Sequence, residues 1–179
     1  MHRRSVAINA RLSEDGRLQV FRLIPAKGIT MSDSNRKIII DAITRMLARR
    51  EHSAVEIIRK LADKGIGEQD SRGAVEEFRS AGIQSDYRFA EMKIRAAYNK
   101  GQGPQRIIGE LAQHKISGDC IKMAMDELSL DWFALAARVR EKKFGEQLPE
   151  DFRQRQKQQQ FLQYRGFSSE HIQEAVNGD

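Results

Sequence analysis

The residue types that most often perform catalysis or bind metals are few and scattered in this chain of 179 residues. Its four histidines are His2, His52, His114 and His171. No two of them have the His-x-x-x-His spacing that lets one helix face hold a zinc ion. The single cysteine, Cys120, lies at the expected start of a helix, where a small apolar filler is more common than a reactive thiolate. The chain is therefore not expected to be an enzyme, nor to hold a metal ion or a cofactor.

One glycine-rich stretch, Gly101-Gln-Gly103-Pro104, resembles the beginning of a phosphate-binding loop. The pattern is incomplete, because no Gly-Lys-Ser/Thr follows it and no strand is expected before it. Pro104 suits the first position of a helix, where its missing N–H would have no helical partner in any case. We interpret the stretch as a turn between two helices.

Basic side chains are the most informative class in this sequence. There are 31 Lys and Arg residues against 25 Asp and Glu, and the net charge of +6 favours an acidic partner, either nucleic acid or an acidic protein surface. Single charges often do no more than solvate a helix, but these gather near expected helix junctions, where a shared stripe would bind phosphates in a salt-dependent way. The few aromatic residues give little support for base stacking. The candidate contacts are Arg49, Arg50, Arg59, Lys60, Lys64, Lys93, Arg95, Lys100, Arg106, Arg138, Arg140, Lys142, Lys143, Arg153, Arg155, Lys157 and Arg165.

The apolar residues that would position these side chains follow a pattern that occurs three times. Leu61, Leu111 and Leu162 are separated by steps of about fifty residues, a period typical of repeat proteins. Within each copy, apolar residues recur every three or four positions and predict three short helices. A unit of about fifty residues buries too little surface to be stable alone, so the copies are expected to pack against one another. The same step relates Ile66, Ile116 and Phe167, and also Ala74-Val75, Ala124-Met125 and Ala175-Val176.

The predicted fold class is therefore all-α, with three tandem three-helix repeats in an elongated, curved body. The expected repeats are residues 34–83, 84–129 and 130–179. Residues 1–33 lie outside the pattern and are expected to form an irregular or weakly β extension. This extension would be either flexible or a hairpin with a strand at residues 18–24. Met31 lies just before the helical body, and a translation start at this residue is an alternative.

Several helix boundaries are predicted from side chains that can accept a hydrogen bond from an unpaired N–H of the first turn. Ser53 and Glu56 have the spacing of a capping box. The eighth helix is expected from Pro149 to Arg165, ended by Gly166. The other expected caps are Ser85 or Asp86, Ser117, Asp131, and Ser168 or Ser169.

The sequence indicates a cytoplasmic protein, which we expect to be a monomer. It has no apolar run of about eighteen residues, so no membrane-spanning helix is expected. The N-terminal region lacks the continuous apolar core and the small-residue cleavage site of a secretory signal. A single cysteine cannot form a disulfide within the chain, which suits a reducing compartment.

Six short stretches, taken in order along the chain, resemble one known protein family, the RecX regulators of bacterial recombination. They are residues 47–53 (LARREHS), 86–90 (DYRFA), 103–111 (GPQRIIGEL), 131–132 (DW), 143–145 (KFG) and 161–167 (FLQYRGF). The similarity covers residues 35–177. Two residues depart from it, since Gln102 stands where an aromatic residue is common and Lys115 stands where glycine is common. Residues 1–33 resemble nothing in the family.

The resemblance implies a regulator of the RecA recombinase rather than an enzyme. RecX proteins bind along the groove of the filament that RecA forms on single-stranded DNA and limit its growth, which reduces ATP hydrolysis, strand exchange and SOS repressor cleavage. On this interpretation the partners are RecA and single-stranded DNA within the filament, or free DNA. The alternative is an independent DNA-binding module, because three-helix units can present a recognition helix to a DNA groove.

Overall fold

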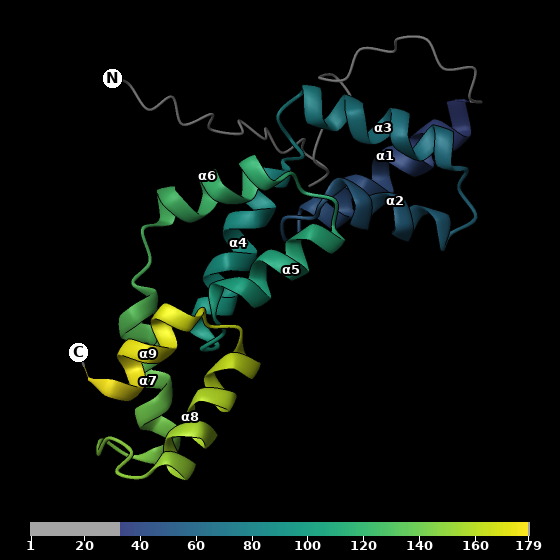
Figure 1. The fold of residues 1–179 in the computed structure, drawn as a ribbon. Coiled ribbons are helices and arrows are strands. Elements are labelled where there is room, and N and C mark those ends of the chain that lie inside the picture. The colour runs from purple at the N-terminus through teal and green to yellow at the C-terminus, as the bar shows by residue number, and fades with distance from the viewer. Residues whose placement is uncertain (1–32, 179) are drawn as a thin grey trace, which may run out of the picture. The chain divides into compact units, whose positions relative to one another are not determined.

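The structure, a computed structural model, describes residues 33–178 of the chain. Within that range the chain forms nine α-helices and no strand (Figure 1), which confirms the all-α class. Residues 1–32 of the expected N-terminal extension, with the strand expected at 18–24 and Met31, lie outside the described residues, whereas Asp33, expected to be its last residue, begins the first helix. The helices are α1 (Asp33–Leu47), α2 (Ala54–Ala62), α3 (Glu68–Ser80), α4 (Asp86–Asn99), α5 (Pro104–Gln113), α6 (Gly118–Leu128), α7 (Trp132–Phe144), α8 (Phe152–Arg165) and α9 (Ser169–Asn177).

The described residues form two compact units. The first comprises residues 33–50 and 57–84, and the second comprises residues 51–56 and 85–178. In the first unit α1 contacts α3, and Arg36 of α1 forms an ion pair of 2.6 Å with Glu77 of α3. Ile43, Leu61 and Phe78, one from each helix, are fully buried. Each helix of the first repeat thus contributes part of its apolar face to the core of this unit.

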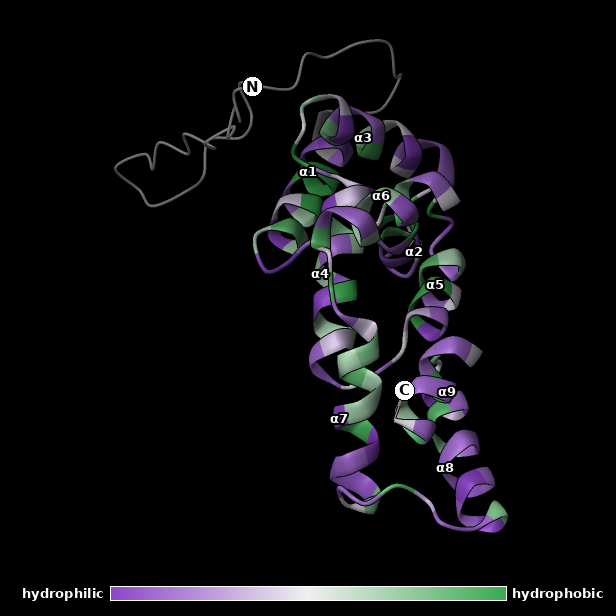
Figure 2. Ribbon diagram, turned by 60° about the vertical axis from the view of Figure 1, so that its left-hand side comes forward, coloured by the Kyte–Doolittle hydropathy of each residue, from purple (hydrophilic) through white to green (hydrophobic). Residues whose placement is uncertain are grey.

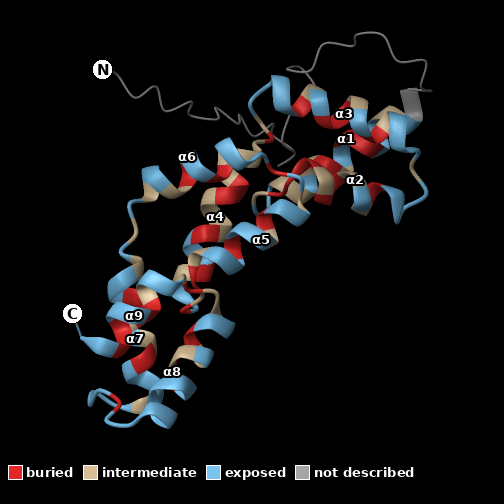
Figure 3. Ribbon diagram, viewed as in Figure 1, coloured by how far each residue is buried: buried red, intermediate tan, exposed pale blue. Residues whose placement is uncertain are grey.

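The second unit contains the other two repeats, formed by α4–α6 and α7–α9. In one of them α4 contacts both α5 and α6, and in the other α9 contacts both α7 and α8. Each repeat has its own cluster of buried side chains, which includes Leu111 in the first and Leu162 in the second (buried residues are red in Figure 3). Trp132 packs against both clusters, and its ring lies edge-on to Tyr98 with the centroids 5.2 Å apart. The two repeats therefore share an apolar contact.

The segment at residues 51–56, which leads into α2, is hydrogen-bonded to the start of α4. The backbone N–H of Ala54 donates to the carboxylate of Asp86 at 2.9 Å. Ser85 accepts a hydrogen bond from the N–H of Arg88 at 3.3 Å and so caps α4. The sequence leaves Ser85 and Asp86 as alternative caps. The structure assigns the cap to Ser85 and gives Asp86 a partner outside its own helix.

Most of the other predicted caps are confirmed. Ser117, Asp131 and Ser168 each accept a hydrogen bond from a backbone N–H of the first helical turn. Ser53 accepts from the N–H of Glu56 at 3.1 Å, as the first half of a capping box requires. Side-chain oxygens therefore set the helix starts much as the sequence indicates.

Helix α8 begins later than the sequence predicts. The expected start is Pro149, but the helix begins at Phe152. The carboxylate of Asp151 accepts a hydrogen bond from the N–H of Gln154 at 2.7 Å and fixes the N-cap at that residue. Pro149 is instead buried in the connection from α7. Gly166, in the left-handed conformation with φ of 88°, ends the helix as predicted.

The turn after the second helix has the same hydrogen bonds in all three repeats. The donors are the N–H groups of Ile66, Ile116 and Phe167, and the acceptors are the carbonyls of Leu61, Leu111 and Leu162, at 3.1, 3.4 and 3.2 Å respectively. The residue before each donor has a positive φ: Gly65 at 79°, Lys115 at 56° and Gly166 at 88°. This is the Schellman motif, and its recurrence agrees with the repeat register predicted from the leucines. Lys115 adopts a backbone conformation that glycine fits better.

The last helix begins with a capping box in which histidine replaces the usual glutamate or glutamine. The hydroxyl of Ser168 accepts from the N–H of His171 at 3.4 Å, and the N–H of Ser168 donates to Nδ1 of His171 at 3.3 Å. The imidazole lies edge-on to the ring of Phe133, with the centroids 4.5 Å apart. Burial lowers the pKa of His171 below its usual 6.5, although Glu170 and Glu174 act in the opposite direction.

Replacing Lys115 by glycine is expected to stabilise the protein by about 0.5–1 kcal/mol, because a left-handed backbone strains an L side chain and not glycine. Urea unfolding of the two proteins would measure the change. Gln113→Gly is a matched control, since Gln113 is exposed in the last turn of α5 and its replacement should cost about 0.5–1 kcal/mol. A Lys115→Gly protein that is less stable than its parent would contradict this account of the turn.

The stability of the protein is expected to fall as the pH drops below 6.5, the ordinary pKa of histidine. In that interval the unfolded chain binds a proton at His171 while the folded state resists it, down to the lower folded-state pKa. His171→Gln retains a side chain suited to the capping box but does not titrate, so its stability should fall less. Melting temperatures of both proteins between about pH 8 and pH 5 would test this. Identical pH profiles would show that His171 does not contribute.

Candidate polyanion-binding surface

Helix α8 is basic and contains no acidic residue. From Phe152 to Arg165 its sequence is FRQRQKQQQFLQYR, in which glutamines fill most of the remaining polar positions. Only Gln158 and Leu162 are buried, so most of the helix surface is at least partly accessible to solvent. In Figure 2 the helix is drawn mostly in the purple of hydrophilic residues. Its cations are Arg153, Arg155, Lys157 and Arg165.

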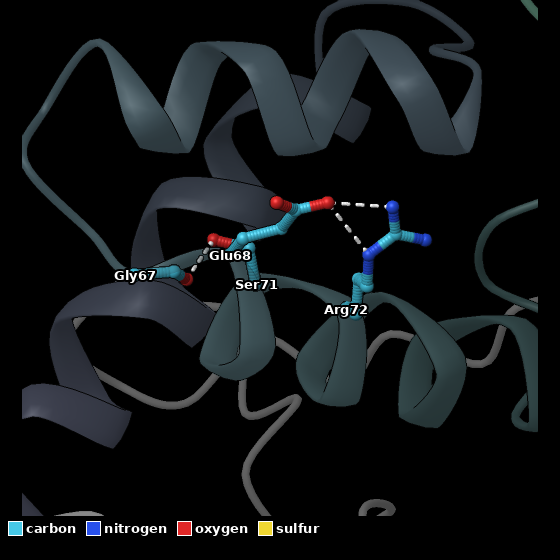
Figure 4. Close-up of polar contacts among 4 residues, drawn as sticks. All are labelled: Gly67, Glu68, Ser71 and Arg72. Carbon is cyan, nitrogen blue, oxygen red and sulfur yellow. Dashed lines mark hydrogen bonds and ion pairs between the residues drawn. The ribbon is translucent and has the colours of Figure 1, made fainter.

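In α3 and α6, by contrast, exposed cations are paired with acidic residues one turn away. In α3, Nε and Nη2 of Arg72 both donate to one carboxylate oxygen of Glu68, at 2.9 and 2.6 Å (Figure 4). In α6, Lys122 pairs with Asp126 at 2.6 Å. Such pairs at i, i+4 stabilise a helix by about 0.2–0.5 kcal/mol each. Because α8 has no carboxylate of its own, its positive charge remains available to an outside anion.

Four exposed residues of α8 lie on one face, and we call them the α8 stripe: Arg153, Lys157, Gln160 and Tyr164. Their steps of four, three and four positions keep them within about 60° of one another around the helix axis. The stripe spans about 16 Å, at about 1.5 Å per residue. It lies on the side of the helix opposite buried Leu162.

Arg106 of α5 extends the α8 stripe onto the second repeat. Its Nη1 donates to the backbone carbonyl of Tyr164 at 3.5 Å. Its guanidinium carbon lies 5.8 Å from the centroid of the Tyr164 ring. The tyrosine is nevertheless 77% exposed, so most of its ring remains accessible. Tyr164 is a surface residue that the reasoning from sequence missed. Tyr164 lies seven residues after Lys157 and eleven after Arg153, and this spacing, which puts all three on one helix face, could have identified it.

A close contact between two backbone segments brings Arg106 and Tyr164 together. The N–H of Gly103 donates to the carbonyl of Arg165 at 2.9 Å, and the N–H of Gln105 donates to that of Gly166 at 3.0 Å. A Cβ on Gly103 would lie 2.4 Å from backbone atoms of Gly166, so only glycine fits at position 103. We call this contact the glycine junction. The glycine-rich stretch is a helix–helix turn, as predicted, and it also connects the second and third repeats.

The end of α7 carries a second group of exposed cations. Lys142 and Lys143 are exposed in the last turn, where positive charge also complements the helix dipole. Arg138 is exposed and lies over the ring of Tyr98, with its guanidinium carbon 5.8 Å from the centroid. These three residues remain available for contact with a partner.

Arg140 does not share this environment. It is only 2% exposed, and its Nη1 and Nη2 donate to the carbonyls of Gln147 and Glu146, each at 3.0 Å. The side chain thus holds the connection between α7 and α8 from the inside. The sequence analysis predicts Arg140 to be a surface contact. The periodicity of apolar residues along a helix does not reveal that the following loop covers this side chain. Its burial removes it from the candidate surface.

The remaining candidates are divided between the two units. In the second unit Lys93 is engaged with Glu110 and lies over the ring of Phe89, whereas Arg95 and Lys100 are exposed. Arg165 is half-buried, and its Nη1 donates to the carbonyl of Lys100 at 3.2 Å. Arg155 is exposed on α8. The first unit contains Arg49, Arg50, Arg59, Lys60 and Lys64, of which Lys60 is half-buried and the others are exposed.

Neither a metal site nor a membrane-spanning helix is found within residues 33–178. In this range no cluster of three or more His, Cys, Asp and Glu residues has an arrangement suited to a metal ion. No helix among these residues is long and apolar enough to cross a membrane.

Comparison with known proteins identifies one family from the sequence. Family models described as the second and third three-helix domains of RecX match residues 85–125 and 130–176. The regulatory protein RecX of Halorhodospira halophila is 38% identical over 136 residues, which cover 76% of this chain and 84% of that protein. This chain belongs to the RecX family. The RecX protein of Legionella pneumophila (strain Corby) is 40% identical over 132 residues, covering 74% of this chain and 88% of its own length.

Two solved RecX structures share the fold. A crystal structure of regulatory protein RecX has a TM-score of 0.69 at 23% identity and covers 89% of this chain and 84% of its own. The crystal structure of RecX from Lactobacillus salivarius also has a TM-score of 0.69, at 19% identity, with 82% and 97% covered. These findings confirm the resemblance stated from the sequence and the tandem three-helix architecture.

Arg140→Ala is expected to destabilise the protein by about 1.5–3 kcal/mol, because two loop carbonyls lose a charged donor and the buried side chain leaves a space. Lys143→Ala, three positions later and exposed, should change the stability by less than about 0.5 kcal/mol. Urea unfolding of the two variants and the parent would measure both effects. Equal stabilities of the two variants would show that Arg140 has no structural role.

Proposed function

We propose that the protein binds the filament that RecA forms on single-stranded DNA and inhibits its growth. Slower growth would reduce ATP hydrolysis, strand exchange and coprotease activity, and so modulate recombination and the SOS response. Membership of the RecX family carries this proposal, since the curated relatives are described as regulatory proteins. The mode of action is binding rather than catalysis, and we expect it to take place in the cytoplasm with the protein as a monomer.

The basic surface supports this proposal in physical terms. A filament containing DNA presents phosphates, and cations that bind them release counterions, which gives an affinity that depends strongly on salt. Helix α8 offers exposed cations with no acidic residue on the same helix. The α8 stripe and the exposed end of α7 are therefore the contacts we favour within the second unit. The exposed cations of the first unit remain candidates for RecA or DNA.

The second candidate function is that of an independent DNA-binding module. The observation that favours it is the same: a helix with exposed Arg, Lys and Gln side chains can bind phosphates and base edges without any protein partner. This function predicts tight binding to duplex DNA in the absence of RecA. The filament proposal instead predicts an effect on RecA at concentrations well below that of RecA itself.

The triple variant Arg153→Gln, Arg155→Gln and Lys157→Gln is expected to inhibit RecA about tenfold less strongly than the parent protein. Glutamine preserves helix propensity and removes three exposed charges of α8, of which Arg153 and Lys157 belong to the α8 stripe and would contact phosphates. DNA-dependent ATP hydrolysis by RecA, titrated with each protein, measures the effect. The salt dependence of filament binding should also decrease, by about one unit of slope for each phosphate that the variant no longer neutralises.

A second triple variant controls for net charge. Lys37, Arg45 and Lys122 are exposed on other helices, and replacing them by glutamine removes the same three charges. This control should inhibit RecA like the parent protein. Equal inhibition by the α8 variant and the parent would remove α8 from the binding surface. No inhibition by the parent, combined with tight DNA binding without RecA, would instead favour the independent DNA-binding module.

A further inference from the structure

An exposed aromatic ring occupies one end of the α8 stripe. Tyr164 is 77% exposed although the same helix buries Leu162 two positions earlier. Large aromatic side chains contribute substantial apolar surface, and leaving one in water brings no stability to the fold. Its ring lies beside the guanidinium of Arg106, whose Nη1 also donates to the Tyr164 carbonyl at 3.5 Å. An open ring next to a fixed cation is an arrangement that binds planar, negatively charged ligands.

The charges next to the ring are spaced along a line. Lys157 and Arg153 follow Tyr164 on the same face, at about 10 Å and about 16 Å along the helix axis. Gln160 lies between the ring and Lys157 and offers both a donor and an acceptor. A chain with a phosphate at each unit and a flat base attached to it fits this order of groups. Such a chain would stack one base on the ring while its phosphates meet the cations.

We propose that Tyr164 and Arg106, together with Lys157 and Arg153, form a binding site for single-stranded DNA in which a base stacks on the tyrosine. The strand must be single, because a base within a duplex already has both faces stacked on its neighbours. An acidic protein segment would satisfy the cations but would make no use of the open ring. The inference rests on the proposed function in one respect only, namely that the strand bound in the cell is the DNA of the RecA filament.

The site is formed in the folded protein without further rearrangement. The glycine junction joins the first turn of α5 to the end of α8 by two backbone hydrogen bonds, at 2.9 and 3.0 Å. A Cβ on Gly166 would lie 2.4 Å from Cβ of Arg106, so the two segments are in direct contact. Because these backbone contacts already hold Arg106 next to Tyr164, the backbone need not rearrange for DNA to bind.

Tyr164→Ala is expected to weaken the binding of fluorescein-labelled oligo-dT by about 5- to 100-fold, the effect of losing one base–aromatic stack. The slope of the affinity against salt concentration should not change, because every phosphate-binding cation is still present. Tyr164→Phe keeps the ring and should bind like the parent. Lys157→Gln should weaken binding and also reduce the salt slope by about one. Fluorescence anisotropy at several salt concentrations, without RecA, measures the DNA affinity of the full-length parent and of the three variants.

Phe152→Ala is the matched control. Phe152 is 79% exposed on the same helix, but it lies about 110° around the axis from the α8 stripe and should not affect DNA binding. Binding of Tyr164→Ala within twofold of the parent would overturn the site, as would an equal loss in Phe152→Ala or no binding of oligo-dT by the parent. If Tyr164→Ala kept its DNA affinity but lost inhibition of RecA, the ring would contact protein and the inference would again fail. Failure of the parent to inhibit RecA would count against the proposed function alone, since DNA binding is measured without RecA.

Discussion

The close backbone contact between Gly103 and Gly166 is the constraint on which the arrangement of the second and third repeats depends. At this point a side chain on either glycine would overlap with its neighbour, so the two turns can meet only because both residues lack one. Gly166 has two roles, since it also adopts the left-handed conformation that ends α8. A turn that occurs in every repeat is thus used here to connect two of them. The positions of Arg106 on one side and Tyr164 on the other follow from that connection.

The positive charge of α8 is not neutralised within the helix, in contrast to several cations on helices of the first two repeats. Arg45 of α1, Arg72 of α3 and Lys122 of α6 are each paired with a carboxylate one turn away. These surface pairs contribute little stability, but they neutralise most of the positive charge of the cations. Helix α8 lacks such pairs because it has no acidic residue, and it gains its stability from the burial of Leu162 and the cap at Asp151. Its exposed cations, Arg153, Arg155 and Lys157, therefore do little for the fold, which is consistent with a role in binding a partner.

The features that could be predicted from the sequence are those that depend on neighbours close along the chain. The spacing of Leu61, Leu111 and Leu162 fixes the helix register, because burial at helical period is a local property. The identity of the caps is also local, although the choice between Ser85 and Asp86 required the segment at residues 51–56, which binds Asp86. The late start of α8 was missed for a similar reason. Pro149 is compatible with a first turn, but its burial in the preceding connection excludes it.

The candidate surface was less predictable, because its decisive contacts join residues far apart in the sequence. Arg140 and Lys143 both lie in the basic end of α7, yet the loop at residues 146–147 covers only the former. Arg106 and Tyr164 are 58 positions apart and meet only through the glycine junction. Few aromatic residues in the composition argued against base stacking, but composition does not show where a single ring lies. One exposed ring beside a guanidinium is enough to form a stacking site.

The glycine junction also bears on whether the glycine-rich stretch could act as a phosphate-binding loop. In a phosphate-binding loop the backbone N–H groups point at the anion, and the resemblance of Gly101-Gln-Gly103-Pro104 to such a loop raises that possibility. Here the N–H groups of Gly103 and Gln105 donate to the carbonyls of Arg165 and Gly166, and Pro104 has none. These donors are used within the protein and do not reach a ligand. A polyanion bound beside this turn would therefore rely on side-chain cations, whose attraction is screened by salt. For this reason the salt dependence of binding is the property that best reports on the proposed surface.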